Sequence, residues 1–65
     1  MSATTWGRQC RANMMLKGMT YYDLVRLTGY SRIYLSKVIN GKVKASDEAL
    51  ETISKTLEVD KSIYT

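Results

Sequence analysis

The stretch from residue 20 to residue 41 reads TYYDLVRLTGYSRIYLSKVING, and it carries start and stop signals for two short helices. Thr20 has a hydroxyl that can accept a hydrogen bond from a backbone amide of the first helical turn, as N-terminal caps do. Gly29 can end the same helix, because glycine readily adopts the left-handed conformation found just past many helix ends. The pattern predicts helices over about residues 20–28 and 31–40, joined by a tight turn.

The segments on either side of this pair also have helical patterns. Residues 6–17 follow a threonine cap and precede Gly18, which predicts a first helix. Ser46, followed by two acidic residues, predicts the start of a fourth helix, because carboxylates are favoured in a first helical turn. The buried stripe of this helix would contain Leu50, Ile53 and Leu57. We therefore expect an all-α fold, a small four- to five-helix bundle formed as a single domain over residues 1–65.

The residue inventory argues against several classes of protein. The 65 residues include one cysteine and no histidine, so neither an internal disulfide nor a Cys/His metal site can form. The usual general base near neutral pH is missing, and Cys10 is expected to be a buried structural thiol. No apolar run approaches the roughly 18 residues of a membrane-spanning helix. We expect no enzymatic activity, no cofactor, no small-molecule ligand and no membrane partner.

Charge is distributed unevenly along the chain. Residues 1–44 carry eight basic residues and one acidic residue, a net charge of +7. Residues 45–65 carry two basic and five acidic residues, a net charge of −3. Such an asymmetry within a small domain favours a basic face directed at a polyanion, with nucleic acid as the leading interpretation. Other acidic partners, an anionic lipid surface and chance clustering remain open on charge alone.

Helical spacing divides the predicted helix 31–40 into two faces. Leu35 and Val38 lie on one side. The other side holds Arg32, Ile33, Ser36, Lys37 and Asn40. An ordinary solvated face would be expected to balance its cations with acidic residues, and this one has none. It fits a helix that reads the DNA major groove, where Arg and Lys bind guanine O6 and N7 and an aliphatic group contacts a thymine methyl. Two short helices joined by a glycine-containing turn form the helix-turn-helix arrangement.

Three sequence segments resemble the Cro/phage-repressor family of helix-turn-helix DNA-binding regulators, also called the XRE or lambda repressor-like family. They are MTYYDLV at residues 19–25, TGYSR at residues 28–32 and LSKVINGK at residues 35–42. Residues 46–59 are similar to that family's fourth helix and its exit. The resemblance covers residues 17–64.

This resemblance implies a role for each matching position. The positions that read bases in the family are Arg32, Ile33, Ser36 and Lys37. The positions that contact the DNA backbone are Thr20, Tyr21, Asn40, Lys42 and Lys44. The family's usual dimer interface would fall on Val59, Ile63 and Tyr64. Two alternatives stand beside these roles: Tyr21 and Tyr22 could pack over the bundle, and Lys42 and Lys44 could be ordinary solvated residues. Thr20 is expected to cap its helix whether or not it contacts a phosphate.

The sequence also departs from the family pattern. Many members pair an Arg late in the first helix with a Glu just before the Asn-Gly dipeptide, but here those positions hold Met14 and Ile39. Replacing both ends of a buried ion pair with apolar groups is often neutral or stabilising, so we expect the fold to be kept. Val25 replaces a usual alanine between the two motif helices, which is expected to widen their packing slightly. Glu58 replaces a usual glycine, so the end of the fourth helix is set only to within one or two residues.

The resemblance implies a sequence-specific DNA-binding transcription regulator, a Cro-like repressor from a phage or mobile element. Its partner would be double-stranded DNA that carries a palindromic operator. A weak homodimer would bind the two half-sites of this operator, which lie about 34 Å apart. A monomer, or a dimer that forms only on DNA, remains open. The expected location is the cytoplasm of a prokaryotic host or phage-infected cell. The chain has no residues to spare for a sensor domain, which makes it more similar to a stand-alone repressor than to a two-domain one.

A second hypothesis comes from a different functional class. The run Met14-Met15-Leu16 cannot face one side of a helix, so some apolar surface is expected to be exposed. A small protein-interaction module, such as an antirepressor or antitoxin, would use such residues to bind another regulator. Salt dependence separates the two hypotheses, because binding through phosphate contacts weakens steeply as salt rises.

Overall fold

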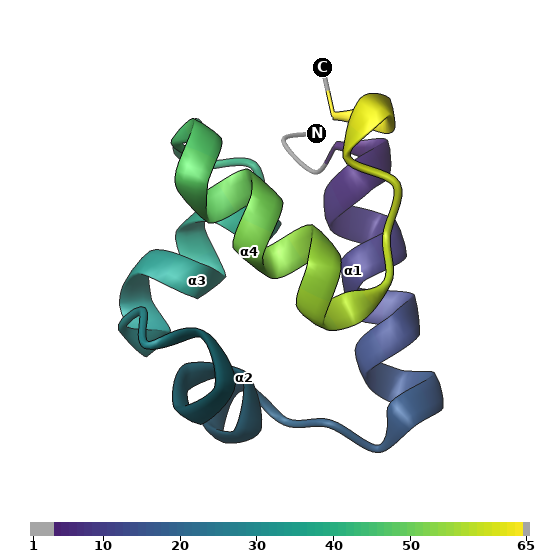
Figure 1. Cartoon of the computed structure of the whole chain (residues 1–65), viewed down its shortest axis with the longest axis vertical. Coiled ribbons are helices and arrows are strands. Elements are labelled where there is room, and N and C mark those ends of the chain that lie inside the picture. The colour runs from purple at the N-terminus through teal and green to yellow at the C-terminus, as the bar shows by residue number, and fades with distance from the viewer. Residues whose placement is uncertain (1–3, 65) are drawn as a thin grey trace.

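The computed structural model describes residues 4–64, which fold into a bundle of short helices (Figure 1). The elements along the chain are α1 (Thr5–Lys17), α2 (Tyr21–Thr28), α3 (Arg32–Ile39), α4 (Asp47–Leu57) and the short 3₁₀ turn η1 (Lys61–Ile63). Residues 4–64 contain no strand, so the all-α fold class is confirmed. α1 and α2 each pack against both α3 and α4, and η1 packs against α1 and α4.

Both motif helices begin, and α2 also ends, at the residues that the sequence indicates. The Thr20 side chain accepts a hydrogen bond from the Asp23 amide (3.2 Å), and the Asp23 carboxylate accepts one from the Thr20 amide (3.0 Å). This reciprocal pair satisfies two amides at the start of α2. Gly29 ends α2 in the left-handed conformation with a φ of 81°. The Ser31 side chain accepts a hydrogen bond from the Tyr34 amide (3.1 Å) and starts α3.

The ends of α3 and α4 refine two of the sequence predictions. α3 stops at Ile39, one residue before the approximate boundary, with Asn40 as its C-cap and Gly41 left-handed at a φ of 76°. α4 stops at Leu57, and Glu58 takes the left-handed conformation at a φ of 59°. Side chains with a Cβ rarely adopt this conformation. Glu58 therefore takes the left-handed cap conformation at the position where the family that the chain resembles usually has glycine. Its backbone is strained as a result.

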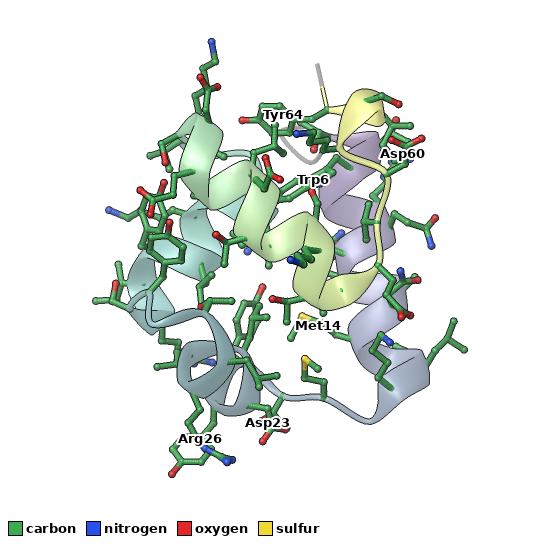
Figure 2. All side chains as sticks on the ribbon, viewed as in Figure 1. Trp6, Met14, Asp23, Arg26, Asp60 and Tyr64 are labelled. Atoms are coloured by element: carbon green, nitrogen blue, oxygen red, sulfur yellow. The ribbon has the colours of Figure 1, made fainter. Side chains whose placement is uncertain are left out.

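Trp6 is fully buried in the core and lies beside Tyr64, so it joins α1 to the second half of the chain (Figure 2). Its indole Nε1 donates a hydrogen bond to the buried Ser54 hydroxyl of α4 (2.8 Å), so neither polar group is left unsatisfied. The Tyr64 ring meets the indole edge-on with ring centroids 5.2 Å apart. The other large side chains with no solvent exposure are Cys10, Leu24, Leu35, Val38, Ile39, Ile53 and Leu57.

The contact between α1 and α3 explains how the chain tolerates losing the family's ion pair. Met14 and Ile39 are both buried in the same apolar core, with exposed fractions of 6% and 0%. No charge is left stranded, which agrees with the expectation that an all-apolar pair keeps the fold. Gly7 brings the two helices close, because a Cβ at this position would collide with the Ile39 carbonyl oxygen. The sequence patterns did not indicate this close approach.

Candidate nucleic-acid interface

α3 buries one face and leaves the other open to solvent. The buried side chains are Leu35, Val38 and Ile39. The exposed side chains are Arg32, Ile33 and Lys37, with Ser36 half-buried beside them. Ile33 is 70% exposed although it is aliphatic. The outward surface of α3 therefore combines two cations, a hydroxyl and an apolar group, which are the chemical types that recognise base edges.

Three basic residues outside this surface form salt bridges, whereas the cations of the surface form none within residues 4–64. Among residues 4–64, salt bridges join Lys17 to Glu58 (2.8 Å), Lys61 to Glu51 (3.0 Å) and Arg26 to Asp23 (3.6 Å). No carboxylate in that same range forms a salt bridge with the basic residues of α3 and the loop after it, Arg32, Lys37, Lys42 and Lys44. Their charge is left to attract an external anion such as phosphate.

The start of α2 and the start of α3 meet through Tyr21 and Arg32. The Arg32 guanidinium carbon lies 5.4 Å from the centroid of the Tyr21 ring, within the range of a cation–π interaction. Tyr21 is half-buried, and this burial raises the pKa of its hydroxyl above the ordinary value. The neutral hydroxyl can therefore donate a hydrogen bond. The Tyr21 ring packs against the bundle, as the alternative interpretation expected. The same ring also lies against the Arg32 guanidinium beside the candidate DNA surface.

Thr20 acts as the cap of α2, and its hydroxyl also donates to the Asp23 carboxylate (3.1 Å). The Thr20 amide and hydroxyl together hold the pKa of Asp23 below its ordinary value, because both donate to the charged form. These bonds already engage the two Thr20 donors. The phosphate contact of Thr20 stays a prediction.

The loop after α3 begins at Asn40, whose side chain joins three elements. Its amide oxygen accepts a hydrogen bond from the Arg11 guanidinium of α1 (2.6 Å), and its amide nitrogen donates to the Ser36 hydroxyl of α3 (3.3 Å). The Lys42 amide donates to the Lys37 carbonyl oxygen (2.8 Å), which folds the loop back on the end of α3. Sequence reasoning missed Arg11, since no pattern links residues 29 positions apart.

An open groove of about 750 Å³ is lined by residues of three helices. Its lining includes Arg11 and Met14 of α1, Tyr21 of α2 and Arg32 of α3. Residues from α1, α2 and α3 therefore border one depression. Arg11 adds a third element to a surface that the sequence predicted from two helices and a loop.

The three residues predicted at the dimer interface belong largely to the fold of their own chain. Val59 is buried, and Ile63 and Tyr64 are half-buried against the core. The Tyr64 hydroxyl accepts a hydrogen bond from the Ala45 amide (2.8 Å). A role in dimerisation stays a prediction. Exposed apolar side chains lie instead at the end of α1, where Met15 and Leu16 are 82% and 83% exposed.

Cys10 and the acidic residues form no chemical centre in the part of the chain that the structure describes. Cys10 has no solvent exposure, and its burial raises the pKa of the thiol to about 12, so it remains protonated. Between residues 4 and 64, no three His, Cys, Asp or Glu side chains gather as metal ligands would. Within the same residues, no helix has the length and apolar character needed to cross a membrane.

Comparison with known proteins agrees with this geometry. A family model described as Helix-turn-helix, of the XRE type that includes Cro, matches residues 8–63. No curated protein matches the sequence significantly. The match extends from α1 through η1 and includes the whole α2–turn–α3 unit with its exposed basic face. The family's domain is a non-enzymatic DNA-binding domain. The chain therefore belongs to the XRE-type helix-turn-helix family of DNA-binding transcription regulators.

Proposed function

We propose that this protein is a Cro-like repressor that inserts α3 into the major groove of a specific operator. The observation that carries the proposal is the outward face of α3, where the exposed cations Arg32 and Lys37 flank an exposed Ile33 and form no salt bridge with residues 4–64. Cations beside an exposed aliphatic group are the chemical types that read base edges in the major groove.

The base-reading residues would be Arg32, Ile33, Ser36 and Lys37. Arg32 and Lys37 carry donors for guanine O6 and N7, and Ile33 offers an apolar surface for a thymine methyl. Contact of Arg32 with Tyr21 supports this assignment, because a side chain held in one place pays less entropy on binding than a free one.

The DNA backbone would be held from both sides of α3. Tyr21 and Thr20 lie at the start of α2, where helix amides favour an anion. Asn40, Lys42 and Lys44 lie at the other end of α3 and in its following loop, and both lysines are exposed. Contacts at the two ends would fix the register of α3, while the base contacts supply sequence discrimination.

We further propose a palindromic operator bound by a weak homodimer, with half-sites about 34 Å apart. The predicted interface at Val59, Ile63 and Tyr64 has little free apolar surface, since these side chains pack against their own core. This favours a dimer that assembles on DNA over one that is stable in solution. Sedimentation with and without operator DNA measures the difference directly.

The decisive experiment is selection of bound sequences from a random DNA pool, followed by titration of the selected site at increasing salt. We expect a defined palindromic site and a slope of log affinity against log salt of roughly −0.9 for each phosphate contacted. A pool that yields no preferred sequence would overturn the proposal.

Exposed Met15 and Leu16 favour a second candidate, a protein-interaction module that binds another regulator. Both residues lie at the end of α1 and outside α3, and Met15 lines the same groove as Arg32. Replacing both with serine separates the candidates. A repressor should keep its affinity for the selected site, whereas a protein-interaction module should lose its partner.

A further inference from the structure

Two consecutive hydrogen bonds connect α1 to the outward face of α3. The Arg11 guanidinium donates to Asn40 Oδ1 (2.6 Å), and Asn40 Nδ2 donates to Ser36 Oγ (3.3 Å). Arg11 is exposed and forms no salt bridge with residues 4–64, so the amide oxygen is the acceptor that fixes its guanidinium. Asn40 also caps α3 through its backbone, which holds the amide near Ser36.

The first bond sets the orientation of the Asn40 amide. A guanidinium group has donors and no acceptor, so only the amide oxygen can face Arg11. The amide nitrogen must then face Ser36, and the Ser36 oxygen must accept its hydrogen bond. Without Arg11 the two amide orientations would be nearly equivalent, and the oxygen could face Ser36 instead.

The Ser36 hydroxyl proton is left without an acceptor among the residues that the structure describes. Hydroxyls within helices often donate to the carbonyl four residues earlier. Thr28 donates in this way to the Leu24 carbonyl and Thr56 to the Thr52 carbonyl, each at 2.8 Å. Ser36 donates to no acceptor among residues 4–64, and it is half-buried on the outward side of α3.

We propose that Arg11 is a positioning residue for base recognition, which it controls by fixing the Asn40 amide so that Ser36 donates a hydrogen bond to a base. The proposal rests on the function proposed above, in which α3 enters the major groove. Guanine, adenine and thymine each present an acceptor there, whereas cytosine presents only an amine donor. The base pair that Ser36 reads should therefore discriminate against cytosine on the contacted strand.

The test measures base preference rather than affinity. Selection with the wild type and with Ser36→Ala identifies the position that Ser36 reads. At that position Arg11→Met should reduce the discrimination against cytosine by about two- to tenfold, the worth of one hydrogen bond. The preferences at the other positions should be unchanged. Arg8→Met is the matched control, because it removes the same charge from α1 and Arg8 makes no bond to Asn40.

Two further variants separate positioning from direct contact. In a Ser36→Ala background, Arg11→Met should leave base preference unchanged, because its route to the base is gone. Asn40→Asp keeps an acceptor for Arg11 but offers a carboxylate to Ser36, whose proton would turn inward. This variant should shift the preference toward cytosine, whose amine can donate to the hydroxyl oxygen.

The outcomes distinguish this inference from the proposed function. If the wild type selects no sequence, the repressor function itself fails. If the wild type selects a site but Arg11→Met keeps full discrimination against cytosine, the positioning role is overturned. It is also overturned if Arg11→Met changes preference in the Ser36→Ala background, since Arg11 would then touch DNA directly. Urea denaturation of each variant confirms that the protein compared is folded.

Discussion

α3 with its following loop and α4 with η1 use charge in opposite ways. In the second region two acidic residues are paired across elements, Glu51 with Lys61 of η1 and Glu58 with Lys17 of α1. In the first region the basic residues form no salt bridge within residues 4–64. A DNA duplex would neutralise the charge that α3 and its following loop leave unpaired.

The largest expected effect comes from the core side of α4. Ile53→Ala should lower the free energy of unfolding by about 2–5 kcal/mol, because a fully buried aliphatic group leaves a cavity. Urea denaturation measures the loss. At low temperature, where folded molecules remain, base preference should match the wild type. A changed base preference would mean that the packing of α4 affects how α3 recognises DNA.

Lys37→Ala tests the outward face of α3, whose cations form no salt bridge within residues 4–64. It should cost about 1–3 kcal/mol of binding to the selected site and relax the preference at one base pair. Stability should hardly change, because the side chain is exposed and forms no salt bridge in residues 4–64. Anisotropy titrations on selected and random DNA give the comparison. Equal losses on both DNAs would contradict a base-reading role for Lys37.

Lys44→Ala should have a smaller and uniform effect. A phosphate contact carries no sequence information, so affinity should fall alike on all DNA and the salt slope should decrease by about 0.9. Lys55→Ala is the matched control, since Lys55 is exposed on α4 and far from the loop in sequence. A similar decrease in slope for Lys55→Ala would show that charge acts at a distance and not through contact.

Glu58→Gly should give the smallest change. Glycine relieves the left-handed strain at this position but removes the exposed ion pair with Lys17, whose contribution is small. We expect a rise in Tm of at most about 5 °C, with DNA affinity unchanged. Glu58→Gln removes the charge but keeps the strain, so its Tm should not rise. A lower Tm for Glu58→Gly would mean that the ion pair outweighs the strain.

Sequence patterns predicted the local features of the fold well. Thr20, Gly29 and Ser31 act at helix ends through bonds to residues three or four positions away, so their identity is enough to place α2 and α3. The start of α4 at Ser46 follows the same logic. The end of α3 differed by one residue, because Asn40 takes the cap position and the left-handed turn falls on Gly41.

Features that depend on distant residues were harder to predict. Gly7 permits contact with α3 through its missing side chain, and nothing near it in sequence shows what it approaches. Arg11 meets a partner 29 residues away, so its hydrogen bond appears only once α1 lies against α3. The Tyr64 ring packs on Trp6 near the other end of the same chain, a contact that no local pattern indicated. Charge and periodicity carry no information on such pairings.

The contact between Trp6 and Tyr64 gives the molecule a built-in optical reporter. Trp6 is the only tryptophan, it is fully buried, and its indole is hydrogen-bonded to Ser54 while Tyr64 covers its edge. Its fluorescence should shift to longer wavelength when the two ends of the chain separate and water reaches the ring. A variant that loses DNA binding while keeping the native emission maximum has lost recognition, and one whose emission shifts has lost its fold.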